Sequence, residues 1–172
     1  HSQLYLMFTT KYGHDHYDPL TITLHAYGHE LLPDIGYTYT KYYCWSLSTF
    51  AHNTVTVDAK DAVAPKDARH GGSLCLFATV DDDVQMVMAA GPTAYESARV
   101  YERELWRIGM GRDDADAGYV VDMFRVEGGH RHEYGLHYDA NHDAFLDPGA
   151  KTVDCPYIPK DVETVYPRKA TD

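Results

Sequence analysis

The sequence predicts an all-β fold, and more narrowly an antiparallel β-sandwich. Residues 20–27 alternate between apolar and polar side chains, and a period of two is typical of a half-buried strand. Residues 73–80 and 84–90 are two strand-like runs joined by three aspartates, which indicates a hairpin. Helical periodicity is weak along the chain. Many strands joined by short turns indicate antiparallel sheets packed face to face.

The remaining elements follow from the same signals. A Gly-His turn at 28–29 leads from the first alternating run into a short second strand, and the glycine pair at 128–129 separates the last two strands. Only residues 61–69 and 94–98 have a pattern that allows a turn or two of helix. We expect the other strands over residues 3–8, 30–32, 54–58, 100–108, 119–126 and 132–138.

Length and composition indicate one globular unit with a tail. The chain has 172 residues, of which 44% are hydrophobic, and this suits a domain with a real core. We assign residues 1–146 to the β-sandwich. Residues 147–172 contain four prolines and are expected to form an irregular tail. No apolar run has the length of a membrane-spanning helix.

The charge argues against several kinds of partner. The chain has 15 Lys and Arg against 26 Asp and Glu, a net charge of −11, and a pI near 5.3. Nucleic acids and anionic membranes are bound by basic surfaces, so neither is an expected partner. Residues 1–53 are nearly neutral and hold six of the eleven histidines and eight of the fifteen tyrosines. We expect the functional site in this part of the chain.

Histidine and aspartate residues within 12–58 form a candidate metal site. His14 and His16 are two positions apart, so they share a face in extended backbone. Asp34 follows the expected short strand 18 residues after His16, and His52 precedes the next strand 18 residues later. Two imidazoles and one carboxylate from three strand ends form a typical zinc set with an open fourth position. For each histidine taken singly, a polar surface position is the alternative.

Three motifs carry a resemblance to a known family. Residues 13–37 read GHDHYDPLTITLHAYGHELLPDIGY and are followed by Trp45 and by AHNTVTVD at 51–58. Together they resemble the heparinase II/III-like region of polysaccharide lyases, a group that includes heparin and heparan lyases and several alginate and oligoalginate lyases. The later runs also look like the sheet region of these enzymes, so the resemblance covers roughly residues 3–140.

The resemblance implies an architecture and roles for four residues. Members of the group have an N-terminal α/α toroid followed by antiparallel β-sheet domains, with the active site in the cleft between them. By resemblance, His16, Asp34 and His52 match the zinc ligands. His14 matches the catalytic histidine that reaches into the cleft beside the metal.

The implied reaction is β-elimination at a uronic acid of an acidic polysaccharide or oligosaccharide. A base removes the C5 proton, a cation or donor neutralises the carboxylate, and an acid protonates the leaving glycosidic oxygen. His14 is expected to be the neutraliser or the base, and the metal to be structural, with a Lewis-acid role as the alternative. Tyr39, Tyr42 and Tyr43 are candidate substrate-binding residues, because some relatives use a tyrosine from this loop.

The chain departs from the family in one respect. The family's catalytic tyrosine lies in the helical toroid, for which this sequence has no counterpart. We therefore expect the sheet module of a lyase, with the helical half missing from this chain, so that the isolated module is inactive or needs a partner half. The substrates of the family imply a periplasmic or secreted protein.

Two other functions share parts of the same pattern. A zinc-stabilised, non-catalytic carbohydrate-binding β-sandwich would use the metal and the tyrosines without a catalytic histidine. A cupin-like metal barrel would use a His-x-His motif such as His14 and His16. It ranks lower, because cupins expect a glutamate a few residues later and the next one here is Glu30.

Overall fold

The computed structural model describes residues 2–8, 16–38, 42–64, 67, 71–81, 83–110, 117–139, 145 and 147–151. Within them the prediction of an all-β fold is confirmed, because strands dominate and every strand pair is antiparallel. The strands are β1 (Gln3–Leu6), β2 (Ile22–Ala26), β3 (His29–Leu32), β4 (Val55–Val57), β5 (Ser73–Thr79), β6 (Val84–Ala90), β7 (Ala98–Gly109), β8 (Gly118–Gly128) and β9 (His132–Tyr134). The helices are α1 (Tyr43–Leu47) and the 3-10 helix η1 (Thr49–Ala51).

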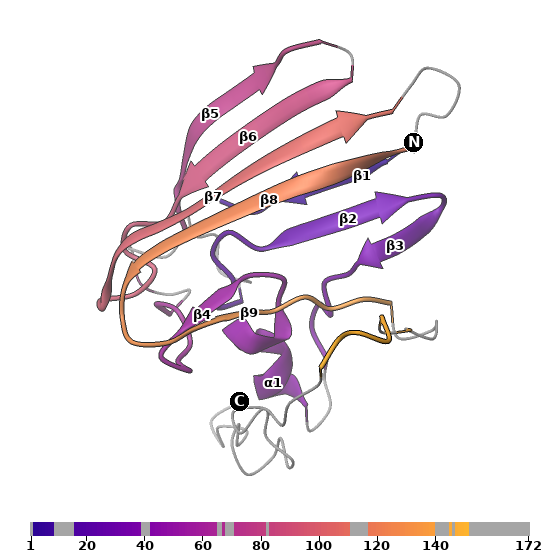
Figure 1. Cartoon of the computed structure of the whole chain (residues 1–172). Coiled ribbons are helices and arrows are strands. Elements are labelled where there is room, and N and C mark those ends of the chain that lie inside the picture. Colours follow the sequence, from indigo (N-terminus) through magenta and orange to yellow (C-terminus); the bar gives the residue numbers. More distant parts are fainter. Residues whose placement is uncertain are drawn as a thin grey trace.

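The strands form three sheets. Sheet β1-β2-β3 and sheet β5-β6-β7-β8 are the two larger ones, and β4 pairs with β9. In Figure 1 the four-stranded sheet lies across the three-stranded sheet, while α1 lies beside β4 and β9 below them. A groove of about 300 Å³ opens between β1 and the inner side of β5, β6 and β7. At this groove Arg107 donates to Ser2 Oγ from both Nε, at 2.9 Å, and Nη2, at 2.7 Å.

Strand β7 provides much of the surface that faces the sandwich interior. Its side chains alternate, and Tyr101, Arg103 and Leu105 are each at most 1% exposed. Glu102 and Glu104 lie on the other face. The period of two predicted a strand here, but an arginine at an interior position was not expected.

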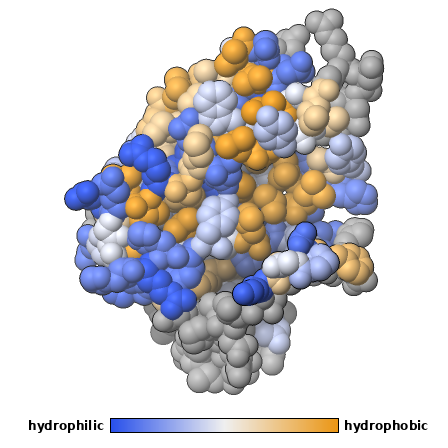
Figure 2. Space-filling view, in the orientation of Figure 1, coloured by the Kyte–Doolittle hydropathy of each residue, from blue (hydrophilic) through white to orange (hydrophobic). Residues whose placement is uncertain are grey.

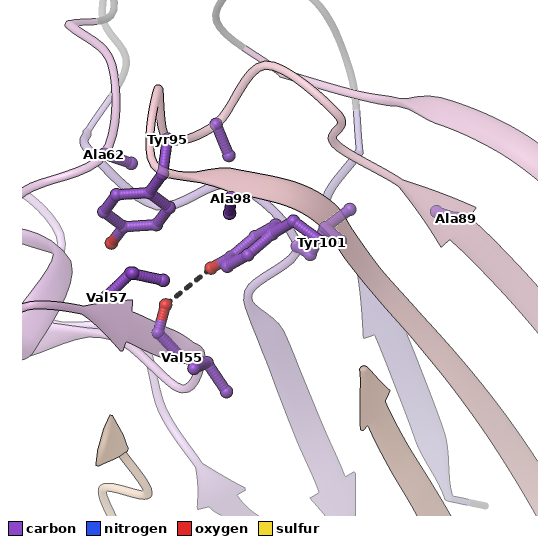
Figure 3. Close-up of a cluster of buried hydrophobic side chains, with 9 residues drawn as sticks. Val55, Val57, Ala62, Ala89, Tyr95, Ala98 and Tyr101 are labelled. Atoms are coloured by element: carbon purple, nitrogen blue, oxygen red, sulfur yellow. Dashed lines mark hydrogen bonds between the residues drawn. The ribbon is translucent and has the colours of Figure 1, made fainter. Parts of the chain in front are cut away.

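The core is small and includes two tyrosines. Its members come from β4, β6, β7 and the loops around them: Leu20, Val55, Val57, Ala62, Ala89, Ala94, Tyr95, Ala98 and Tyr101. Figure 3 shows the Tyr101 ring reaching from β7 toward Val55, whose carbonyl oxygen accepts a 2.7 Å hydrogen bond from the Tyr101 hydroxyl. Burial raises the pKa of both core tyrosines, so their hydroxyls stay protonated and act as donors.

Apolar side chains also lie on the surface. Figure 2 shows them gathered over the middle and upper part of one face, across the two larger sheets. The edge strand β5 contributes Leu74, Leu76 and Phe77, which are 47%, 44% and 66% exposed. They stand on both faces of the strand. No helix in the described part of the chain has the length and hydropathy to span a membrane.

Several local expectations were wrong. The described residues of 61–69 are not helical, and residues 94–98 form turns leading into β7. The helix lies instead at Tyr43–Leu47, a single turn too short to show a 3.6-residue period. The strand expected over residues 54–58 forms at Val55–Val57, and all three of its residues are buried. The last strand is limited to His132–Tyr134, and the tail lies outside the described residues beyond 151.

The buried arginine of β7 is the centre of a hydrogen-bond network. Arg103 Nε and Nη2 donate to Asp122 on β8, at 3.1 and 2.5 Å, and Nη2 also donates to the Tyr134 hydroxyl at 2.5 Å. Its Nη1 donates to the carbonyl oxygens of Leu20 and Asn53, at 2.7 and 2.6 Å. One side chain therefore joins β7 and β8 to the loops that precede β2 and β4.

Replacing this arginine is expected to destabilise the fold strongly. Arg103→Met removes the cation that pairs with the Asp122 carboxylate and one donor from each of the Leu20 and Asn53 carbonyl oxygens, and should lower the free energy of unfolding by about 3–5 kcal/mol. Urea unfolding measures the change. Arg99→Met is the matched control, because Arg99 also pairs with a β8 carboxylate but is 81% exposed. It should cost no more than about 1 kcal/mol. Equal losses in the two variants would contradict the role given to Arg103.

Candidate metal centre

The three predicted metal ligands lie together in the structure. His16 Nδ1 is 2.8 Å from His52 Nε2, and His52 Nε2 is 3.4 Å from Asp34 Oδ2. The ligand atoms of the three residues all lie within 4.8 Å of one another. Both imidazoles are buried, whereas the Asp34 side chain is 31% exposed. The cluster therefore opens to solvent on the side of the carboxylate.

His52 is held by the turn of η1 that precedes it. The 3-10 helix ends at Ala51, and the ring Nδ1 of His52 lies 2.7 Å from the carbonyl oxygen of Ser48. A carbonyl only accepts, so Nδ1 carries the proton and donates. The lone pair is then on Nε2, which points at Asp34 and His16. This is how metal-binding histidines are commonly oriented by their surroundings.

His16 is held through the residue next to it. The Tyr17 backbone N–H donates to the carbonyl oxygen of Leu47 at 2.8 Å, and the Tyr17 carbonyl accepts from Thr49 Oγ1. The loop before β2 is thereby tied to α1 and η1. The ring of Tyr37 packs edge-on against the His16 imidazole, with centroids 4.8 Å apart.

Asp34 is oriented by a local turn after β3. Its Oδ1 accepts a 2.7 Å hydrogen bond from the Gly36 backbone N–H, as in an Asx turn. Gly36 has a φ of +64°, a conformation that glycine adopts without steric cost. With Oδ1 engaged, Oδ2 is the oxygen that faces His52.

The donor set fits a divalent transition-metal ion. Two neutral imidazole nitrogens and one carboxylate oxygen suit such ions. Ligand atoms of a tetrahedral site with bonds of about 2.0–2.1 Å stand about 3.3 Å apart. The His52–Asp34 distance of 3.4 Å matches this value. The two imidazole nitrogens, at 2.8 Å, would separate by a few tenths of an ångström around an ion.

Of the other predicted site residues, two are described and two are not. His14 and Tyr39 lie outside the described residues. Tyr43 stacks on Tyr37, with centroids 6.2 Å apart and planes at 21°. Because Tyr37 packs on His16, Tyr43 is connected to the metal cluster indirectly, through the Tyr37 ring. Tyr42 precedes α1 and is 45% exposed. Sequence reasoning missed Tyr37, whose one signal was its place three residues after Asp34 in the same motif.

A buried carboxylate lies behind η1. Asp61 Oδ1 accepts from the Thr49 backbone N–H at 2.8 Å. Burial raises the pKa of Asp61, and hydrogen bonding from Thr49 acts against this rise. Burial, followed by the charge of Asp61, also raises the pKa of Tyr17. An acidic group thus lies on the inner side of the helical turns that carry His52.

The partly buried ring of His137 is expected to make the stability of the fold depend on pH. Its Nε2 lies 2.9 Å from the Phe50 carbonyl oxygen, and burial lowers the pKa of the ring. The folded state therefore binds fewer protons than the unfolded state once the pH falls below about 6.5. The contribution of His137 to stability is present above that pH and is lost as the pH falls toward the lowered pKa.

Urea unfolding at about pH 7.5 and about pH 5.5 tests this. Because a glutamine can keep an N–H donor toward Phe50, His137→Gln should lose less stability between the two pH values than the unaltered protein. An identical pH dependence in the two proteins would contradict the assignment.

One family model matches most of the chain, and solved structures share its fold. The family described as Heparinase II/III-like, C-terminal matches residues 6–156. Two solved structures, of the heparinase III BT4657 gene product with and without methylated lysines, each share 23% sequence identity and a TM-score of 0.58. Each match covers 74% of this chain and 19% of the solved chain. No curated protein matches. The chain belongs to the heparinase II/III-like C-terminal family.

Proposed function

We propose that this chain is the β-sheet module of a polysaccharide lyase that cleaves glycans containing uronic acids by β-elimination. In this proposal His16, Asp34 and His52 hold a zinc ion, and His14 is the catalytic histidine. The observation that carries it is the convergence of those three donors from three separate segments, in a chain whose family is heparinase II/III-like.

Zinc is supported by the chemistry of the three donors. His52 presents Nε2 because its Nδ1 is engaged by Ser48, and Asp34 presents one oxygen because the other is engaged by Gly36. Both imidazoles are removed from water. Three protein ligands leave a fourth tetrahedral position for water or another group. Zinc has no geometric preference of its own from d-electrons, so it can bind two imidazoles and one carboxylate in the arrangement that the protein provides.

The proposed role of the ion is mainly structural. Its ligands come from the loop before β2, the turn after β3 and the end of η1. When bound, the ion supplies a positive charge that cross-links these three segments. Since His14 stands two residues before His16, fixing His16 also limits where His14 can reach.

The proposed reaction balances as a proton transfer with loss of an alcohol. The C5–H and C4–O bonds of the uronate break, the C4–C5 double bond forms, and the leaving glycosidic oxygen gains a proton. His14 donates to the uronate carboxylate, which lowers the cost of the negative charge that develops there, or it accepts the C5 proton itself. Tyr39, Tyr42 and Tyr43 are proposed to bind the sugar, since aromatic faces pack well on C–H surfaces.

A larger enzyme completes the proposal. The chain spans 19% of the heparinase III chains that it resembles. A helical toroid half, on the parent chain or on a partner, is proposed to supply the other wall of the cleft and the remaining acid or base. Polysaccharides that contain uronic acids lie outside the cytoplasm, so we propose a secreted or periplasmic enzyme.

The second candidate function is a non-catalytic, zinc-stabilised carbohydrate-binding module. The stack of Tyr43 on Tyr37 beside the metal cluster favours it, because such a module needs the metal and the aromatic rings only. The cupin-like alternative is set aside, since the family match assigns the chain elsewhere.

Removing and restoring the metal tests the zinc site. Zinc added to chelator-treated protein should raise the melting temperature, because an ion that binds only the folded state stabilises it by mass action. His52→Ala should abolish that rise. His25→Ala is the control, since His25 is an exposed histidine paired with Glu30 on the neighbouring strand, and this variant should respond as the unaltered protein does. A response in His52→Ala equal to that of the control would contradict the proposed ligand set.

Substituting the catalytic histidine tests the lyase proposal. His14→Ala, made in the enzyme that contains both halves, should reduce turnover by at least about a hundredfold, while zinc content stays unchanged. The assay is the ultraviolet absorbance of the unsaturated uronate product. Retained turnover would remove His14 from the mechanism. Binding of the glycan without any turnover in the unaltered enzyme would favour the non-catalytic module.

A further inference from the structure

Each metal-ligand candidate stands beside a residue whose backbone is anchored. Tyr17, next to His16, is tied to α1 and η1. Pro33, next to Asp34, offers its carbonyl oxygen to the Asn53 side chain. Asn53 itself is next to His52. One buried amide therefore connects the neighbours of two ligands, although none of its atoms lies in the ligand cluster.

Asn53 is 1% exposed, and its side chain is fully engaged. Its Nδ2 donates to the carbonyl oxygens of Ile22, at 3.0 Å, and Pro33, at 2.9 Å. Its Oδ1 accepts from the His137 backbone N–H at 2.7 Å. Two acceptors face the nitrogen and one donor faces the oxygen, so the amide has a single orientation.

We propose that Asn53 is a positioning residue of the metal centre, whose amide holds the segments of Asp34 and His52 at ligand spacing before an ion binds. The inference rests on the zinc site proposed above. It assigns the preorganisation of that site to one side chain that does not coordinate.

Arg103 supports the same residue from behind. Its Nη1 donates to the Asn53 carbonyl oxygen at 2.6 Å and to the Leu20 carbonyl oxygen at 2.7 Å. The Ile22 N–H also donates to the Asn53 carbonyl, at 3.3 Å. Both the side chain and the backbone of Asn53 are thus fixed, and a displacement of this residue would move His52 directly.

The required chemistry is narrow. The position needs two donors and one acceptor on a planar group of this length, which asparagine supplies. Aspartate has the same shape but places an acceptor against the Ile22 and Pro33 carbonyl oxygens. Alanine leaves all three backbone partners unsatisfied in a buried site, and unpaired buried groups relax by moving.

Zinc affinity, measured by competition with a chromophoric chelator, tests the proposal. Asn53→Ala and Asn53→Asp should weaken zinc binding by about tenfold to a hundredfold, the usual effect of losing a residue that orients the ligands. In the Co²⁺-substituted protein, the visible absorption should change in intensity, because the ligands no longer enforce the same geometry. Unchanged affinity and an unchanged Co²⁺ spectrum in folded Asn53 variants would overturn the proposal.

The matched control separates positioning from general stability. Leu105→Ala removes a buried side chain of β7 that lines the groove beside β1, and none of the hydrogen bonds of Asn53 involves this residue. It should lower the melting temperature of the metal-free protein but keep the zinc affinity within about threefold of the unaltered value. A loss of affinity equal to that of the Asn53 variants would assign the effect to stability and overturn the proposal.

Measurements on the unaltered chain cover the case in which the Asn53 variants do not fold. The side-chain amide protons of Asn53 should resist hydrogen exchange in the metal-free protein as well as in the zinc-loaded protein, because the contacts precede the ion. Rapid exchange without zinc would overturn the proposal. If the unaltered chain binds no zinc, the proposed metal site itself fails, and the role of Asn53 fails with it. If the unaltered chain binds zinc and the Asn53 variants bind it equally well, only the role of Asn53 fails.

Discussion

The buried guanidinium of Arg103 ties strand β7 to β8, to β9 and to the loops before β2 and β4. It is 0% exposed and donates five hydrogen bonds, to Asp122, Tyr134, Leu20 and Asn53. The rings of Phe124 and Tyr134 lie 5.3 and 5.5 Å from its carbon Cζ. A charge so far from water is tolerated only when its donors are satisfied. The fold supplies those partners from β8, from β9 and from the loops before β2 and β4.

This constraint explains why a domain with a small core can hold a precise cluster of side chains. The core buries apolar surface, including that of Val55, Val57 and the two tyrosines. Dispersion contacts have no preferred direction, so they do not orient the backbone carbonyl groups. The polar network does, because each hydrogen bond has a preferred direction. The ligand cluster lies at the end of this network, because Asn53, which Arg103 contacts, is next to His52 and bonds the Pro33 carbonyl beside Asp34.

The sequence predicted the β-sandwich and the three ligand candidates, and it did so for physical reasons. The strand-like runs at 73–80, 84–90 and 100–108 form strands as expected, and alternate side chains of β7 turn inward. His16, Asp34 and His52 stand in motifs whose residue types suit a metal, and they converge. The role of His14 stays a prediction, as does the boundary near residue 146.

What the sequence did not predict depends on contacts between distant segments. From the sequence, Arg103 is expected to be a charged residue on the exposed face of its strand. It can be an interior residue because its hydrogen-bond partners lie 19 to 83 residues away along the chain. From the sequence, Asn53 is expected to be a turn residue before β4, but its side chain forms hydrogen bonds with three other segments. The short helix α1 leaves no periodic pattern. The Asp34–Gly36 turn is a local feature, but the sequence does not show that the Tyr37 ring after it packs on His16, a residue of another segment.

The sequence separations within this network also bear on how the molecule assembles. The partners of Asn53 lie 20, 31, 50 and 84 residues away along the chain, and contacts of such long range form late because closing the intervening loops costs entropy. The hairpin β5–β6 closes over a much shorter span and needs none of them. The ion-binding geometry is therefore a product of nearly complete folding. A metal ion would stabilise the finished domain rather than nucleate it, in contrast to small zinc domains that fold only around their ion.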